Sequence, residues 1–463
     1  MLTSRDMFPG LPMITAAAFF MQMFNSTILN TALPAIADAM GRSPFSMQLA
    51  VISYSLTVAL LIPLSGWLAD TFGTRRVFLS ALAMFVIGSG LCAASTTLPL
   101  LVAARVVQGV GGALMRAYTR EDFVKVFNFI TIPGLVGPVV GPIVGGWLVT
   151  YASWPWIFLI NIPLGLVILF FSLRCFPDFR QPRGSFDVAG FLLIGAGVLA
   201  MSGGLELTGG HGASPALACG LVVFGVAAIV LYVLHARRFR FPIINLKVFS
   251  TRTFSVGITG NIVARLGIGS IPFLVPLMLQ VGLGYSADIA GLILIAPAVG
   301  SVMTKTVVLN ILHRFGYRRT LLFLTLSIAA VFMCMSLQQP GWPLMLLVVQ
   351  LFVQGMLMSG QFTSMNTITL GDLPAETASD GNSLLSVAQN LSVSFGVAVS
   401  TALLRVFSSS GELYALHATF IAVGLMTAVS AFIFMLLRPE DGAHLLSNDS
   451  DAAAGSRSKG KRS

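Results

Sequence analysis

The chain has 463 residues, of which 56% are hydrophobic and only 10% are charged, and its mean hydropathy is +0.88. Soluble domains carry about 25% charged residues, so this composition excludes a soluble globular protein. The formal net charge of +10 comes largely from arginines and lysines in short segments between apolar runs. That distribution is a signal of membrane topology and not of a nucleic-acid-binding face, so we expect no nucleic-acid partner.

Apolar runs of about 20 residues, the length that crosses the hydrocarbon core of a bilayer, recur along the whole chain. Fourteen of them predict membrane-spanning helices, at residues 12–36, 48–69, 77–96, 98–115, 126–149, 154–173, 187–206, 214–235, 254–280, 287–310, 320–337, 342–367, 381–406 and 414–437. The first run lacks a small-residue cleavage pattern, which favours an anchored helix over a removable signal peptide.

Lysine and arginine fall in alternate connections between the predicted helices. The connections that contain them lie near residues 73–76, 116–125, 174–183, 237–252 and 314–319. The connections that contain none lie at residues 95–98, 208–213, 282–287 and 338–342. Because cytoplasmic loops are enriched in lysine and arginine, we predict an even number of spans with both termini in the cytoplasm.

The four cysteines stand singly, without C-x-x-C spacing, which argues against a metal site or a disulfide framework. The chain also lacks a glycine-rich phosphate-binding loop with its lysine, which argues against direct coupling to ATP. We therefore expect no cofactor.

The connection between the second and third predicted helices contains Gly66, Asp70, Gly73, Arg75 and Arg76. The two glycines are expected to form a tight turn, because glycine reaches positive φ without a steric penalty. The Asp70 carboxylate can pair with the arginines or with a helix N-terminus. An ordinary charged loop is the simpler interpretation of such residues. The complete pattern, G-x-x-x-x-D-x-x-G-x-R-R, resembles the loop between helices two and three of the major facilitator superfamily, which makes these residues candidates for a conformational-switch loop.

The fourth predicted helix contains Arg105, with Gln108 and Gly109 one turn later. A charge inside the bilayer is costly unless it is paired, so such a residue is a candidate for a functional site. An arginine that merely braces neighbouring helices is the alternative. The spacing R-x-x-Q-G resembles the fourth-helix motif of the superfamily, in which this arginine is implicated in proton coupling.

The fifth predicted helix carries a motif of small residues. Its glycines and prolines are Gly137, Pro138, Gly141, Pro142, Gly145 and Gly146. Glycines four residues apart form a smooth face that lets another helix approach closely, and proline removes a backbone donor and softens the helix. Simple packing is the alternative, and it does not exclude a hinge. The pattern G-x-x-x-G-P-x-x-G-G resembles that of proton-driven exporters of the superfamily.

Two further stretches narrow the resemblance to the fourteen-helix drug:proton antiporter branch. They are T-I-L-N-T-A-L-P, which contains Asn30, and W-P-W-I-F-L-I-N-I-P, which contains Asn161. The resemblance covers nearly the whole chain, and it is greatest to enterobacterial-type inner-membrane exporters.

This resemblance implies an all-α integral membrane protein with the major facilitator fold and fourteen spans. It implies two six-helix bundles at residues 1–183 and 237–438, with two additional central helices at residues 184–236. The polar composition of residues 439–463 predicts a disordered cytoplasmic tail. The implied activity is export of amphipathic or cationic drug-like compounds from the cytoplasm in exchange for protons. The protein would act as a monomer in the lipid bilayer of a bacterial inner membrane, driven by the proton gradient.

Two departures from the family pattern leave an alternative open. Asn25 stands where the family has an aspartate, and asparagine cannot ionise near physiological pH. After Met115 about nine residues of the fourth helix are absent, or about 13 Å of helix. A transport-deficient or regulatory membrane protein derived from such an exporter is therefore the second hypothesis. A membrane-embedded enzyme is a more remote one, because no nucleophile–base pair or carboxylate dyad is visible.

Few other charges lie within the predicted spans. Glu206, near the outer end of the seventh, is a candidate replacement proton carrier, although solvation at the interface explains it equally well. Arg265, within the ninth, is a candidate for the wall of a substrate cavity, together with Asn30 and Asn161.

Overall fold

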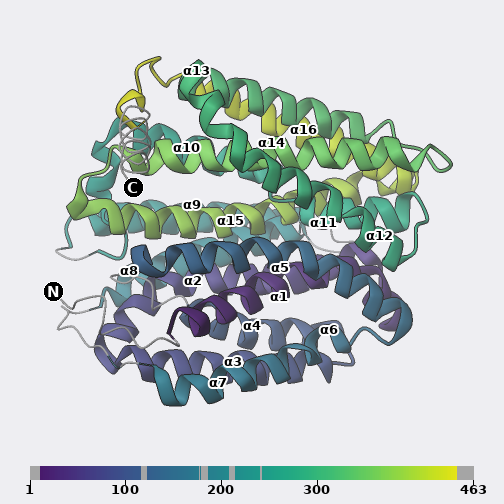
Figure 1. Ribbon diagram of the computed structural model, residues 1–463, viewed down its shortest axis with the longest axis horizontal. Helices are drawn as coiled ribbons and strands as arrows, with labels where there is room; N and C mark the ends of the chain where they lie inside the picture. Colours follow the sequence, from purple (N-terminus) through teal and green to yellow (C-terminus); the bar gives the residue numbers. More distant parts are fainter. Residues whose placement is uncertain are drawn as a thin grey trace, which may run out of the picture.

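The computed structural model describes residues 11–115, 123–176, 178, 186–207, 214–239 and 242–445. Every regular element within these residues is helical. Most of the helices lie side by side along the longest axis of the molecule (Figure 1). The fold is all-α, as predicted.

The first group of helices lies in the lower half of Figure 1. It consists of α1 (Leu11–Ala39), the short η1 (Pro44–Met47), α2 (Gln48–Phe72), α3 (Thr74–Ala93), α4 (Leu98–Leu114), α5 (Phe123–Tyr151), α6 (Trp156–Leu159) and α7 (Asn161–Cys175). α1 packs on α5, and α4 packs on α2 and α3. The sixth predicted helix was expected to be continuous, but it divides into α6 and α7, because Pro163 has no N–H to donate to the carbonyl of Leu159.

Two helices follow that pack against each other, α8 (Val188–Leu207) and α9 (Pro215–Ala236). After them, residues 242–245 lead into the short η3 (Leu246–Ser250) and the second large group. α8 also contacts α15 of that second group, so this pair is attached to the C-terminal half of the molecule.

The second large group lies in the upper half of Figure 1. It consists of α10 (Arg252–Ile268), α11 (Ile271–Leu277), the π-helical turn η4 (Met278–Gly282), α12 (Ala287–Ile293), α13 (Ile295–Met335), α14 (Leu344–Gly371), α15 (Ala375–Phe407), η5 (Ser408–Ser410) and α16 (Glu412–Phe434). The ninth predicted helix is thus broken into α10, α11 and η4, since Pro272 and Pro276 lack donors. Within α13, Gly316 has φ of +71° and separates two helical stretches at the predicted connection.

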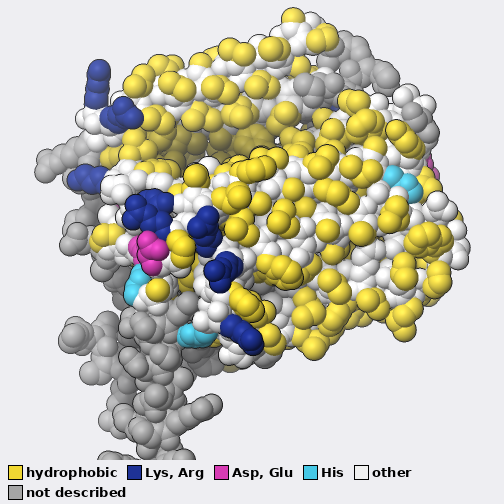
Figure 2. Space-filling model, turned by 90° about the horizontal axis from the view of Figure 1, so that it is seen from above, with side chains coloured by type: hydrophobic (Ala, Val, Ile, Leu, Met, Phe, Trp, Pro, Cys, Tyr) yellow, Lys and Arg dark blue, Asp and Glu magenta, His cyan; other side chains and the backbone are white. Residues whose placement is uncertain are grey.

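The outside of the molecule matches a lipid bilayer. Eleven helices among the described residues are long and apolar enough to cross a membrane, and Leu98–Leu114 and Val136–Tyr151 are shorter apolar helices. On the face drawn in Figure 2, hydrophobic side chains cover most of the surface and the lysines and arginines gather toward one end. The chain is a multi-pass membrane protein, while the count of fourteen spans and the domain boundaries stay predictions.

The two large groups contact each other mainly through α2 with α15 and α5 with α12. Smaller contacts join α1 to α11 and α12, and α5 to α13. Buried side chains of both groups, such as Ile28 and Leu33 on α1 and Phe273 and Leu274 on α11, form one continuous hydrophobic core. Polar side chains that are buried inside this apolar core are therefore candidate functional residues.

Candidate functional site

Arg105, on α4, is fully enclosed by the N-terminal group, with 1% of its surface exposed. Its Nε donates to the backbone oxygen of Ala50 (3.0 Å), and its Nη1 donates to Oε1 of Gln108 (2.6 Å). Its Cζ lies 4.3 Å from the centre of the Tyr54 ring, within reach of a cation–π interaction. Arg105 and Gln108, two residues of the fourth-helix motif, are thus in direct contact one helical turn apart.

Gln108 continues this network to α1, α3 and α7. Its Nε2 donates to Oδ1 of Asn25 (3.1 Å) and to Oγ of Ser89 (2.7 Å), and Nδ2 of Asn161 also donates to Asn25 Oδ1 (3.3 Å). Two donors thus converge on one atom at position 25, an arrangement that a carboxylate would satisfy at least as well. The Nδ2 of Asn25 and the Oδ1 of Asn161 are both buried without a hydrogen-bond partner.

Arg265, on α10, is the corresponding buried arginine of the C-terminal group, with 9% of its surface exposed. Its Nε donates to Oδ1 of Asn261 (2.6 Å), one turn earlier, and its Cζ lies 4.1 Å from the centre of the Phe362 ring on α14. Asn261 donates to Oδ1 of Asn366 (3.1 Å), which also accepts from Nε2 of Gln389 on α15 (2.9 Å). Sequence reasoning found Arg265 but missed these three amides. The N-x-x-x-R spacing, which puts Asn261 on the same face, could have found the first of them.

The expected conformational-switch loop is a very short connection between α2 and α3. Gly73 has φ of +95° and forms the turn, whereas Gly66 lies inside α2. The expectation that Gly66 shares the turn is therefore wrong, because the helix continues to Phe72. Arg75 donates to the backbone oxygen of Leu173 at the end of α7. Asp70 is half-buried and Arg76 is exposed.

The glycines of α5 lie against α1 as their spacing predicts. A methyl group on Gly141 would lie 2.2 Å from Oγ1 of Thr27, and one on Gly145 would lie 2.5 Å from the backbone oxygen of Ile28. Gly137 makes a similar approach to Met23 on the same helix. Side chains at these positions would push α1 away from α5.

The last part of the same motif contacts the C-terminal group. A methyl group on Gly146 would lie 2.2 Å from the backbone oxygen of Ala287, and one on Gly291 would lie 2.5 Å from that of Pro142, which also accepts from Oγ1 of Thr31 (3.4 Å). Pro138 lies one turn before Pro142 in the helix. The motif therefore joins α5 to α1 and to α12 at once.

A sequence model of the Major Facilitator Superfamily matches residues 15–251 and 257–459. The chain belongs to this superfamily. It is 44% identical over 438 residues to the "Putative multidrug resistance protein MdtD" of Escherichia coli strain K12, a match that covers 91% of this chain and 93% of that protein. The protein of the same name from Shigella boydii serotype 4 has the same identity and coverage.

Solved structures show the same fold at low sequence identity. A POT family transporter in complex with 5-aminolevulinic acid has a TM-score of 0.68 at 14% identity, and it covers 93% of this chain and 96% of its own. A D-xylose-proton symporter has a TM-score of 0.65 at 15% identity, and the match covers 93% of this chain and 98% of the symporter. These likenesses show the fold, while the superfamily match and the relatives named above indicate a multi-pass protein of a bacterial inner membrane.

One residue proposed from the sequence lies apart from both arginine networks. Asn30, on α1, has 5% of its surface exposed, and its Oδ1 is buried without a partner. The next residue, Thr31, accepts a hydrogen bond through its backbone oxygen from Nε2 of Gln280 in the other half (3.0 Å), so Asn30 lies close to the contact between the halves. The side chain of Glu206 lies outside the described part of the structure.

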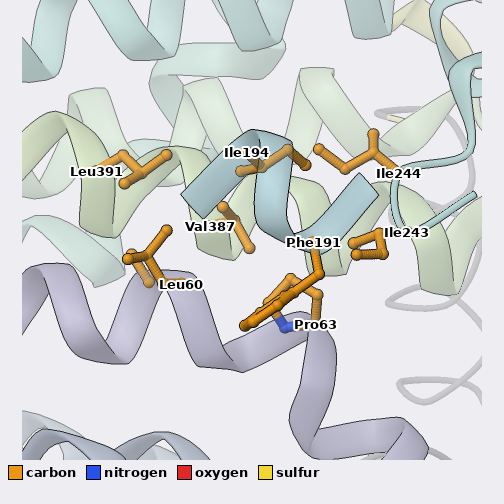
Figure 3. Close-up of a pocket in the computed structure, with 9 residues that line it drawn as sticks. Leu60, Pro63, Phe191, Ile194, Ile243, Ile244, Val387 and Leu391 are labelled. Atoms are coloured by element: carbon orange, nitrogen blue, oxygen red, sulfur yellow. The ribbon is translucent and has the colours of Figure 1, made fainter. Parts of the chain in front are cut away.

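An apolar pocket lies where both halves of this superfamily member meet the additional helix pair (Figure 3). Its walls come from α2, α8, α15 and the connection before η3. The residues that line it are Ala59, Leu60, Pro63, Phe191, Ile194, Ile243, Ile244, Val387 and Leu391. Sequence reasoning missed it, because the pocket depends on how four separate segments pack.

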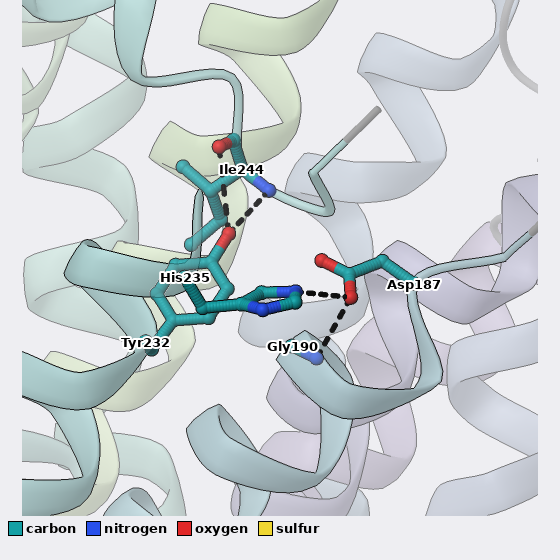
Figure 4. Close-up of polar contacts among 5 residues, drawn as sticks. All are labelled: Asp187, Gly190, Tyr232, His235 and Ile244. Atoms are coloured by element: carbon teal, nitrogen blue, oxygen red, sulfur yellow. Dashed lines mark hydrogen bonds and ion pairs between the residues drawn. The ribbon is translucent and has the colours of Figure 1, made fainter. Parts of the chain in front are cut away.

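Polar contacts hold that connection and the helix pair in place (Figure 4). Asp187 caps α8 by accepting from the backbone N–H of Gly190 (2.8 Å), and its Oδ1 lies 2.8 Å from Nε2 of His235 on α9. The Tyr232 hydroxyl accepts from the N–H of Ile244 (2.8 Å). An aspartate directly before an apolar run is a helix-start signal, but the sequence gives no sign of the histidine contact.

Proposed function

We propose that this protein exports amphipathic small molecules from the cytoplasm in exchange for protons, with both termini in the cytoplasm. The observation that carries the proposal is the buried network of Arg105, which draws polar groups from α1, α2, α3, α4 and α7 into the centre of an otherwise apolar group of helices. Burying a charge is costly, and a network of this size is more than a brace for two neighbouring helices requires.

The multidrug-resistance name of the relatives supports a substrate class of drug-like compounds. In the proposed cycle, substrate binds between the two halves, and rocking of one half against the other exposes it to each side in turn. The glycine motif of α5 supports such movement, because it lets α1 and α12 approach the backbone without interlocking side chains.

Contacts at the end of the molecule opposite the arginine-rich loops would act as the outer gate. There Gln280 donates to the backbone oxygen of Thr31, and the hydroxyl of Tyr151 donates to Oδ2 of Asp288 (3.2 Å). These contacts would have to open for release. The group that carries the proton differs from that of the family pattern, since Asn25 cannot ionise, and Glu206 is our first candidate.

The transport-deficient hypothesis also has a structural observation in its favour. α4 contains 17 residues, which corresponds to about 25 Å of helix, whereas the hydrocarbon core is ~30 Å thick. The absent turns lie on the cytoplasmic side of Arg105. The contacts of Arg105 with Ala50 and Gln108 are formed all the same.

A proton-flux assay tests both hypotheses. Purified protein in proteoliposomes with an internal pH-sensitive dye would be exposed to a panel of amphipathic compounds. The proposal expects substrate-dependent proton movement that an uncoupler abolishes. Proton flux that no compound alters, from correctly inserted protein, would favour the transport-deficient alternative.

A further inference from the structure

Arg265 is a buried cation whose charge is not neutralised by any described side chain. No described carboxylate lies within ion-pair distance of it, and its single hydrogen bond, from Nε to Asn261, is to a neutral amide. The outer two nitrogens of the guanidinium, Nη1 and Nη2, make no hydrogen bond to a described residue. A buried, unpaired guanidinium is unfavourable by itself, so this geometry indicates a place for an anion.

The neighbouring side chains leave an open face that is rich in donors. Asn261 is buried, but Phe362, Asn366 and Gln389 are only half-buried. The Oδ1 of Asn366 accepts two hydrogen bonds, one of them from the Asn261 side chain that also accepts from Arg265. No described residue accepts from the Nδ2 of Asn366, so this nitrogen can donate to a ligand. The Oε1 of Gln389 accepts from no described residue and suits a donor group of a ligand, such as the ammonium of a zwitterion.

The guanidinium is also held in position before any ligand arrives. Its Nε is fixed by Asn261, and one face lies over the ring of Phe362 at 4.1 Å. This leaves the Nη1–Nη2 edge, which matches the two oxygens of a carboxylate in bidentate geometry. Aromatic stacking beside that edge suits a ligand with an apolar body attached to the acid.

We propose that Arg265, with Asn366, binds the carboxylate of an amphipathic substrate. This inference rests on the proposed export function and narrows its substrate class from drug-like compounds in general to organic acids and zwitterions. Bound carboxylate would neutralise Arg265, and a neutral analogue of the same shape would leave that charge unpaired.

Binding and transport are measured separately, so that the carboxylate site and the export function can each be contradicted independently of the other. The binding assay uses purified protein in detergent free of acidic lipid, and a series of aryl-acetic acids with one to three fused rings, each with its aryl-acetamide as the neutral isostere. Calorimetric titration gives the ratio of acid to amide affinity. The variants are Arg265→Gln, Arg265→Lys and the control Arg438→Gln, which removes an exposed arginine outside the helices.

We expect the unmodified protein to prefer the acid by about tenfold or more, the size of one charge-assisted bidentate contact. Arg265→Gln should reduce the ratio to about one without weakening amide binding, Arg265→Lys should keep part of the preference, and Arg438→Gln should keep all of it. An unmodified protein without a preference for acids, or an Arg265→Gln variant that keeps it, would overturn the proposal.

Addition of vesicles containing phosphatidylserine or oleate distinguishes a lipid carboxylate from a free acid, because only a lipid ligand would displace the aryl acid at low mole fraction. Such displacement would overturn the assignment to a transported substrate. If no compound changes proton flux but the protein still binds acids more tightly than amides, the export function is contradicted and the anion site is retained.

Discussion

Arg105 and Arg265 are both buried arginines within helices of the two halves, yet their surroundings differ. Arg105 donates through Nε and Nη1, lies over Tyr54 and is 1% exposed. Arg265 donates through Nε alone, lies over Phe362 and is 9% exposed. The first is enclosed by its own half, and the second has an edge directed away from its protein partners.

This difference separates two tasks that one buried arginine could not perform together. An arginine that donates through both Nε and Nη1, as Arg105 does, fixes the positions of the groups that accept from it, since moving either acceptor leaves a polar group unpaired. An arginine with free donors keeps capacity for a ligand. We therefore expect substitutions at position 105 to affect transport of every substrate and substitutions at position 265 to affect selectivity.

The largest expected effect is that of Arg105→Ala. The variant leaves Gln108 Oε1 and the backbone oxygen of Ala50 without their donor inside the core, which costs a few kcal/mol. Substrate-dependent proton flux should fall to the background of empty liposomes for acids and neutral compounds alike, while size-exclusion chromatography shows inserted, monodisperse protein. Normal flux would mean that Arg105 only braces α4.

A second prediction concerns the driving force for an anionic substrate. Moving one charge across 100 mV changes the equilibrium ratio by about 50-fold. In acid-loaded proteoliposomes without a pH gradient, an inside-negative potassium–valinomycin potential should therefore accelerate efflux of an aryl-acetic acid more than that of its amide, because proton exchange moves one charge with either compound and the acid carries one more. Arg265→Gln should lose this difference. Acid efflux that is no more sensitive to the potential than amide efflux would contradict transport of the anion.

Glycine substitutions test how closely α1 packs against α5, and so how firmly Asn25 is held near Gln108. In Gly145→Ala the new methyl would lie 2.5 Å from the backbone oxygen of Ile28, so α1 has to shift and carry Asn25 away from Gln108. We expect a loss of about 1–3 kcal/mol in stability and several-fold slower transport. Gly195→Ala is the control, because no atom lies within 4 Å of its added methyl, and it should raise the melting temperature slightly. Equal melting temperatures for the two variants would contradict the close approach.

The sequence predicted the helices well, because length and hydrophobicity decide where a chain can cross a bilayer. It predicted less well where helices break, as at Pro163 and Gly316, since a membrane helix often tolerates such residues. Arg105, Gln108, Asn25 and Asn161 were each proposed from motifs, but their convergence required the packing of α1, α4 and α7. The partners of Arg265 on α14 and α15 lie more than ninety residues away in sequence, and no local pattern points to them.

The smallest expected effect is that of Asn25→Asp alone. The Oδ1 of Asn25 already accepts from Gln108 and Asn161, so a carboxylate fits the same donors, and it removes the buried Nδ2 that has no partner. It would also add an ionisable group beside the network of Arg105. We expect only a small gain in proton coupling, because α4 still lacks the turns that would carry it across the core.

Adding those turns should reveal the effect of the carboxylate. A helical insertion of about nine residues after Met115, combined with Asn25→Asp, should raise substrate-dependent proton flux more than the sum of the two single changes, because neighbouring groups in one network couple non-additively. The unmodified chain, the two single changes and their combination are compared in the same proteoliposome assay, with Asn25→Leu as a control that removes the polar group without adding a charge. A combined variant that gains no more than the sum of the two single changes would contradict this prediction and leave the proton on another group, with Glu206→Gln as the next variant to measure.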